Sequence, residues 1–200
     1  MNMLKSLSHF VLASIAAAVV TATPATAQDS PWSSYAAKFM CNAQNANDIV
    51  AVFGLYRTVV NIHNPHYLHD MLDLPVPLIF YKKAVLTKPQ GEIPFPPSCH
   101  QLEFLSADTG LAVTCNNIKT LLALAGLPVT GLIEGFLVIE VPPQPASQPQ
   151  APPLDVVTVY TARQRKGTDA DVRRYDVQTL DVERVPSTTI IGDPTLNLCD

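Results

Sequence analysis

The sequence predicts a mostly β protein, an antiparallel sandwich or barrel with one short helix. Short runs of β-branched and aromatic residues recur along the chain, and residues that favour turns separate them. One segment alone has a helical pattern. Hydrophobic residues make up 48% of the chain and charged residues 15%, a balance that favours a packed core over a disordered chain.

Seven or eight segments have the composition of strands. The two clearest are 132–141 and 154–162, and in the second of these Val157 and Val159 alternate with Thr158 and Tyr160. The remaining candidates are 35–41, 55–63, 76–87, 101–105, 111–115 and 179–185. Because 106–110 is rich in turn-forming residues, we expect 101–105 and 111–115 to pair as a hairpin.

The helical segment is 118–125, which is rich in leucine and alanine. Asn116 and Asn117 precede it as capping residues, while Gly126 and Pro128 end it. We expect this helix to cover one end of the sandwich. The alternative is a helix that binds a partner.

The N-terminus has the three parts of a signal peptide. Lys5 lies in a short first region, 10–20 is an apolar run, and Ala25-Thr26-Ala27 matches a cleavage site. The alternative is a buried N-terminal helix, although the run is shorter than the roughly 20 residues that span a bilayer. We therefore predict a leader at 1–27 and one mature domain at 28–200, exported to the periplasm or the extracellular space without a transmembrane segment.

The predicted export determines how the four cysteines are interpreted. An even number in an oxidising compartment predicts two disulfides, and three pairings are possible. We favour Cys41–Cys115 because each of these cysteines ends a strand-like run, which leaves Cys99 to pair with Cys199. A metal or redox site is the alternative, but the chain has no CxxC motif.

Six prolines lie within 142–153, between the two clearest strands. Proline lacks the backbone N–H that an interior strand donates, so we predict an extended polyproline loop inserted into the domain. A ligand for a proline-reading partner is the alternative. Recognition commonly occurs on loops of a rigid scaffold, and the candidate binding loops are 64–75, 89–97 and 142–153.

The candidate chemical sites are sparse. His63, His66 and His69 recur every third residue beside Asp70, and imidazoles that converge can bind zinc or copper. Asp169, Asp171 and Asp176 lack the glycine and glutamate of a calcium loop. A solvated hairpin tip, or a site for an anionic partner, is predicted for the cations Arg163, Arg165, Lys166, Arg173 and Arg174.

Six segments together resemble a group of uncharacterised exported bacterial β-rich proteins. They are Tyr35-Ala-Ala-Lys-Phe-Met-Cys41, Val60-Asn-Ile-His-Asn-Pro65, Tyr81-Lys-Lys-Ala-Val-Leu86, Gly135-Phe-Leu-Val-Ile139, Leu154-Asp-Val-Val-Thr-Val-Tyr-Thr-Ala162 and Asp181-Val-Glu-Arg-Val185. The resemblance implies export and an immunoglobulin-like sandwich, and it transfers no catalytic residue. The chain departs from the group at 142–153 and at Cys99 and Cys199.

We therefore expect an exported, non-enzymatic binding or structural module with an unknown protein or envelope partner and no cofactor. The net charge of -4 argues against nucleic acid and anionic membranes as partners. The chain lacks nucleophile-elbow, zinc-protease and phosphate-cradle motifs. A metal-binding or metalloenzyme module that uses the three histidines is the alternative. A hydrolase without a local motif and an edge strand that joins other chains are further hypotheses.

Overall fold

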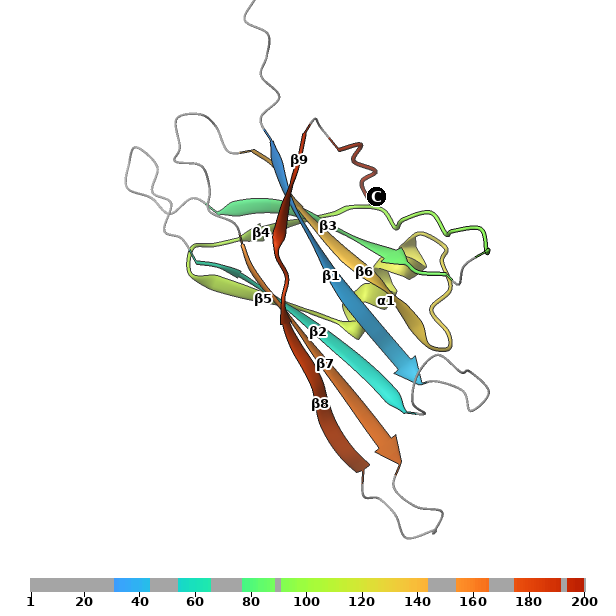
Figure 1. Cartoon of the computed structure of the whole chain (residues 1–200). Helices are drawn as coiled ribbons and strands as arrows, with labels where there is room; N and C mark the ends of the chain where they lie inside the picture. Colours follow the sequence, from blue (N-terminus) through green and yellow to red (C-terminus); the bar gives the residue numbers. More distant parts are fainter. Residues whose placement is uncertain are drawn as a thin grey trace, which may run out of the picture.

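The computed structural model describes residues 31–43, 54–65, 77–88, 91–143, 154–165, 175–191 and 194–199. Within these ranges the chain forms nine strands and one helix (Figure 1). The elements are β1 (Trp32–Ala43), β2 (Leu55–Asn64), β3 (Leu78–Leu86), β4 (Gln101–Leu105), β5 (Thr109–Thr114), α1 (Cys115–Leu124), β6 (Ile133–Val141), β7 (Asp155–Arg165), β8 (Tyr175–Arg184) and β9 (Ser187–Ile190). The predicted β class is confirmed, whereas the predicted leader lies outside the described residues.

The nine strands form one antiparallel sheet in the order β4-β3-β6-β1-β2-β7-β8, with β5 added to β2 and β9 added to β1. The pairs fall into a β1 group (β4, β3, β6, β1 and β9) and a β2 group (β5, β2, β7 and β8). Two residue pairs, Asn42 with Tyr56 and Ala43 with Leu55, join β1 to β2. The two strands therefore meet at one end of the molecule (Figure 1).

Side chains of β2 and β7 form hydrogen bonds with the backbone of β1 where β1 is not paired with β2. The hydroxyl of Thr58 accepts the N–H of Met40 at 2.9 Å and donates to the Met40 carbonyl at 3.0 Å. The Tyr160 hydroxyl donates to the carbonyl of Lys38 at 3.2 Å. A polar backbone group away from water needs a partner, and these hydroxyls supply it where no strand does.

The core lies along the alternating inward positions of the strands. In β1 the residues Tyr35, Ala37, Phe39 and Cys41 are at most 1% exposed, and β6 adds Leu137 and Ile139 on the same face. Helix α1 contributes Ile118, Leu121 and Leu122 to this core. Burial of each such large apolar side chain contributes about 1.5–3 kcal/mol before the cost in conformational entropy.

Helix α1 begins three residues earlier than the sequence predicts. Thr114 is its N-cap, and the Asn117 side-chain oxygen accepts the Thr114 N–H at 2.9 Å. Asn117 therefore supports the cap from inside the first turn and is not the cap itself. The helix ends as predicted, because Gly126 adopts a φ of 68° and donates its N–H to Ala123.

The predicted hairpin of 101–105 and 111–115 is wrong. β4 pairs with β3, whereas β5 pairs with β2. The buried Asn64 donates its side-chain amide to the Leu105 carbonyl at 3.2 Å, and its own carbonyl accepts the Asp108 N–H at 2.8 Å. These bonds direct the chain from the edge of β3 to the edge of β2.

The proline-rich insertion separates strands that do not pair with each other. β6 pairs with β1 and β3, whereas β7 pairs with β2 and β8. Residues 142 and 143 are described, and 144–153 lie outside the described residues. The connection therefore joins the β1 group to the β2 group.

Candidate functional site

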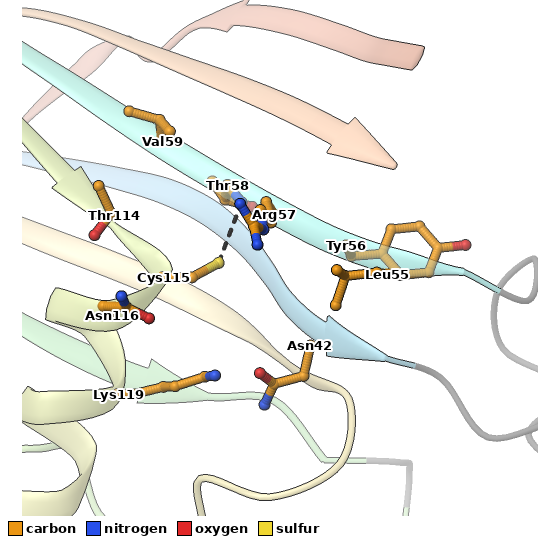
Figure 2. A pocket seen from close by; sticks show the side chains of 10 residues that line it. All are labelled: Asn42, Leu55, Tyr56, Arg57, Thr58, Val59, Thr114, Cys115, Asn116 and Lys119. Atoms are coloured by element: carbon orange, nitrogen blue, oxygen red, sulfur yellow. Dashed lines mark hydrogen bonds between the residues drawn. The ribbon is translucent and has the colours of Figure 1, made fainter. Parts of the chain in front are cut away.

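A pocket of about 340 Å³ lies where β1, β2 and the start of α1 meet (Figure 2). It is lined by two cations together with neutral polar and apolar groups. The lining residues are Asn42, Leu55, Tyr56, Arg57, Thr58, Val59, Thr114, Cys115, Asn116 and Lys119.

The pocket arises because two strands share one edge of β2. Leu55 and Tyr56 pair with β1, whereas β5 pairs with β2 from Val59 onward. Arg57 and Thr58 lie in the interval between these two pairings. The strand register therefore leaves a fork in the sheet, and the pocket occupies it.

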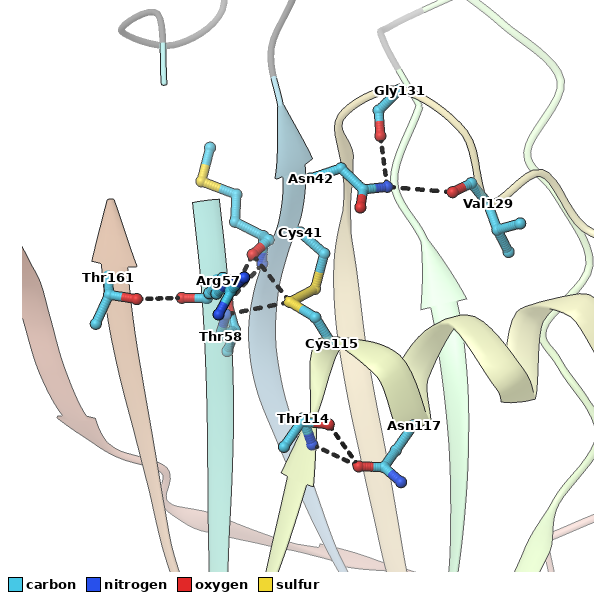
Figure 3. The surroundings of a disulfide bond; sticks show 11 residues. Cys41, Asn42, Arg57, Thr58, Thr114, Cys115, Asn117, Val129, Gly131 and Thr161 are labelled. Atoms are coloured by element: carbon cyan, nitrogen blue, oxygen red, sulfur yellow. Dashed lines mark hydrogen bonds between the residues drawn. A yellow bond between two sulfur atoms is a disulfide. The ribbon is translucent and has the colours of Figure 1, made fainter. Parts of the chain in front are cut away.

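The disulfide Cys41–Cys115 lies at this fork (Figure 3). Cys41 near the end of β1 is buried, while Cys115 at the start of α1 lines the pocket. The backbone N–H of Thr58 donates to the Cys115 sulfur at 3.2 Å. The disulfide thus joins β1 to α1, and the hydrogen bond from Thr58 links β2 to the same sulfur.

The pocket is lined by two positively charged side chains. Arg57 is exposed and Lys119 is half-buried, and neither forms an ion pair with a described residue. Among the residues that the structure describes, no carboxylate lines the pocket. The first turn of α1 also has no acidic residue, so the positive end of the helix dipole adds to the same potential.

Asn42 forms the wall near Lys119 (Figure 2). It has a φ of 82°, a region in which asparagine is among the more tolerated residues. Its side-chain nitrogen donates to the carbonyls of Val129 at 3.1 Å and Gly131 at 2.7 Å. These bonds tie the end of β1 to the segment before β6, so the wall is held from two sides.

A second hollow of about 240 Å³ shares Tyr56 and Arg57 with the pocket but has mixed charge. Asp181 and Glu183 line it together with Tyr160. Burial, followed by the charge of Glu183, raises the pKa of Tyr160 to about 12. Two cations, Lys38 and Arg57, and two carboxylates therefore line this hollow, whereas the described lining of the first pocket contains only cations as charged groups.

The structure places one of the three predicted metal-ligating histidines. His63 Nε2 lies 3.2 Å from Asp108 Oδ1, so its imidazole already has a partner. His66 and His69, with Asp70, lie outside the described residues. No group of three potential ligands occurs among the residues that the structure places. The metal hypothesis therefore stays a prediction, and metal analysis of the purified protein is its test.

The other charged clusters are placed in part. Asp169, Asp171, Lys166, Arg173 and Arg174 lie outside the described residues. Of the candidate binding loops, 91–97 is described, and most of the other two is not. None of the described members of these groups lines the pocket.

The two cations of the pocket are not predicted as a site by the sequence. Arg57 is the one charged residue of β2 apart from the titratable His63, and this isolation inside a strand is the signal that was available. Lys119 is an ordinary residue of an amphipathic helix and gives no such signal. Arg57 and Lys119 are brought together by the register of β2 with β5.

The structure contains two disulfides, Cys41–Cys115 and Cys99–Cys199, which are the pairings that the sequence favours. Such bonds persist in oxidising compartments and indicate an extracytoplasmic location. No described helix is long and apolar enough to cross a membrane. Comparisons with protein families, curated proteins and solved structures found no match.

Proposed function

We propose that this protein is an exported, non-enzymatic binding module that holds a small anionic ligand in the pocket at the fork of β2. One observation carries the proposal: Arg57 and Lys119 line the same pocket, and no carboxylate among the described residues lines it with them. A ligand that carries a carboxylate, phosphate or sulfate group would supply the missing charge.

The surroundings of the two cations favour an anion over a neutral ligand. Arginine offers a planar fork of donors and lysine a compact charge, so together they can contact different oxygens of one group. The N-terminus of α1 lies beside them, and its dipole favours negative charge. A volume of about 340 Å³ is at the small end of ligand sites, which suits a small molecule.

The same proposal includes an immunoglobulin-like sandwich architecture and export through a leader. A β1 group and a β2 group that share a core, and meet at one end, are consistent with an immunoglobulin-like sandwich. Export through a leader at 1–27 agrees with the two disulfides. A periplasmic or extracellular binding module fits both.

Titration calorimetry with acetate, inorganic phosphate and sulfate as separate probes tests the function. We expect at least one probe to bind the unmodified protein, more weakly as salt is raised. Replacement of both pocket cations, Arg57→Gln with Lys119→Gln, should weaken this binding at least tenfold. Lys38→Gln is the matched control, because Lys38 is an exposed cation on β1 that does not line the pocket.

Two results would contradict the proposal. The first is that none of the probes binds. The second is that the double substitution and Lys38→Gln weaken binding equally, since general surface charge and not the pocket would then attract the anion.

A further inference from the structure

Among the described residues, none pairs with the outer edge of β4 along most of its length. β4 is the last strand in the order and pairs with β3. Just before it, His100 donates its N–H to the Asn197 carbonyl, and its own carbonyl accepts the Cys199 N–H at 3.0 Å. The backbone of His100 therefore faces away from β3. Because the backbone alternates along a strand, that of Leu102 and Phe104 faces the same open side.

The side chains next to this open edge are apolar and exposed. Phe104 is 60% exposed, Leu102 is 41% exposed, and Ile79, which lies opposite Phe104 on β3, is 38% exposed. Natural edge strands are commonly protected by charge, proline or a covering segment. The one charged residue of β4 does not protect this edge, because Glu103 bonds to the buried Lys82 of β3.

We propose that two copies of this chain associate by pairing their β4 strands antiparallel about a two-fold axis at Glu103. This register places Leu102 of each copy opposite Phe104 of the second copy. Both of these residues direct their backbone groups outward, as a hydrogen-bonded pair requires. The exposed side chains of the two copies then continue one apolar strip across the axis.

The C-terminal tail that binds His100, Asn197 to Cys199, excludes one alternative register and limits the length of a strand that can pair with β4. An axis at Leu102 would set Phe104 against His100, whose outward backbone groups are already bound by the tail. A strand much longer than β4 would collide with the tail for the same reason. The β4 strand of a second copy is five residues long and fits the open length.

Charge does not oppose the pairing. The two Glu103 carboxylates would approach each other at the axis, but each is neutralised by its own Lys82. The contact is nevertheless small, because it consists of five residues from each copy. We therefore expect a weak dimer that forms reversibly as concentration rises.

Sedimentation equilibrium of the purified protein over a range of concentrations tests the inference. We expect a monomer–dimer equilibrium that Phe104→Lys weakens at least tenfold. Val182→Lys is the matched control, because Val182 is 57% exposed on β8, at the opposite end of the strand order. Hydrogen exchange at the Leu102 and Phe104 amides should slow as the dimer forms.

The inference is overturned by a monomer at every concentration. A dimer that Phe104→Lys leaves intact also overturns it. A dimer that Val182→Lys weakens and Phe104→Lys does not would place the interface on β8 instead. Because Phe104 is exposed, the lysine variant should keep the fold, and circular dichroism checks that it does.

Discussion

The backbone N–H of Thr58 donates to the sulfur of Cys115 at 3.2 Å, across the fork at which β2 changes partners from β1 to β5. This bond links the strand that carries Arg57 to the helix that carries Lys119. The disulfide that Cys115 forms with Cys41 holds this end of the helix against β1 (Figure 3), so we expect the shape of the pocket to depend on it.

Removal of this disulfide should destabilise the protein and abolish anion binding. The bond closes a loop with a sequence separation of 74, for which the chain-entropy model gives about 4–5 kcal/mol. Cys41→Ala with Cys115→Ala is the test, measured by denaturant unfolding and by calorimetry. The pair Cys99→Ala and Cys199→Ala should cost similar stability but leave anion affinity unchanged. Equal loss of anion affinity in both variants would show that the pocket does not depend specifically on the Cys41–Cys115 disulfide.

Gly135 on β6 should not tolerate alanine. A Cβ at this position would overlap the Val85 carbonyl oxygen and lie 3.0 Å from both Phe39 Cζ and Leu86 Cα. We expect Gly135→Ala to lower the free energy of unfolding by about 1–3 kcal/mol, as overpacking does. Gly110→Ala is the control, because its Cβ would lie 3.6 Å from the Ile62 carbonyl, an ordinary contact. Equal stability of the two variants would show that the close approach at Gly135 is absent.

Glu140 should be essential for the attachment of the C-terminal tail. Glu140 is 3% exposed. Its carboxylate binds Lys83 Nζ at 2.8 Å and His100 Nε2 at 3.1 Å. Glu140→Ala leaves both partners without an acceptor and should cost roughly 3–5 kcal/mol. Glu134→Ala on the same strand should cost less than about 1 kcal/mol, since Glu134 is only half-buried and the bond that its carboxylate accepts from Thr87 is exposed to solvent.

Hydrogen exchange distinguishes this role from general destabilisation. His100 Nδ1 accepts the N–H of Asn197 at 3.0 Å, so loss of the Glu140 bond should free that amide. In Glu140→Ala we expect exchange to accelerate more at the amides of Asn197 and Cys199 than at the amides of the core strands. Uniform acceleration throughout the protein would contradict a local role.

The protein should lose stability in alkali through Tyr35. This side chain is 1% exposed, and burial raises the pKa of its phenol to about 12 from the usual 10. The unfolded chain ionises first, so the stabilisation is complete below pH 10 and is lost as pH rises through 12. Tyr35→Phe should flatten the decline of stability between pH 10 and pH 12. The same decline in the variant and the parent would contradict this assignment.

Much of the fold follows from local sequence pattern. Eight strands overlap the eight predicted segments because alternation of apolar and polar residues sets one buried face per strand, as in β2 and β3. Helix α1 has a clear end because Gly126 takes a positive φ. These features depend on neighbouring residues, so a local pattern is sufficient to predict them.

Partner choice depends on distant residues and was harder to predict. β4 and β5 resemble a hairpin locally, yet Asn64 holds the link between them and each strand pairs elsewhere. β9 is short and largely polar, and it is a strand because it pairs with β1 at Trp32 to Tyr35. The pocket was missed for the same reason, since Arg57 and Lys119 meet through the register of β2 with β5.

Nuclear magnetic resonance titration with the anion that calorimetry selects is the most direct test of the proposed function. Chemical-shift changes should be largest at the backbone amides of Thr58, Cys115 and Asn116, and they should disappear when Arg57 and Lys119 are both replaced by glutamine. Shifts that centre on another surface, or that persist in the double variant, would contradict an anion site at the fork of β2.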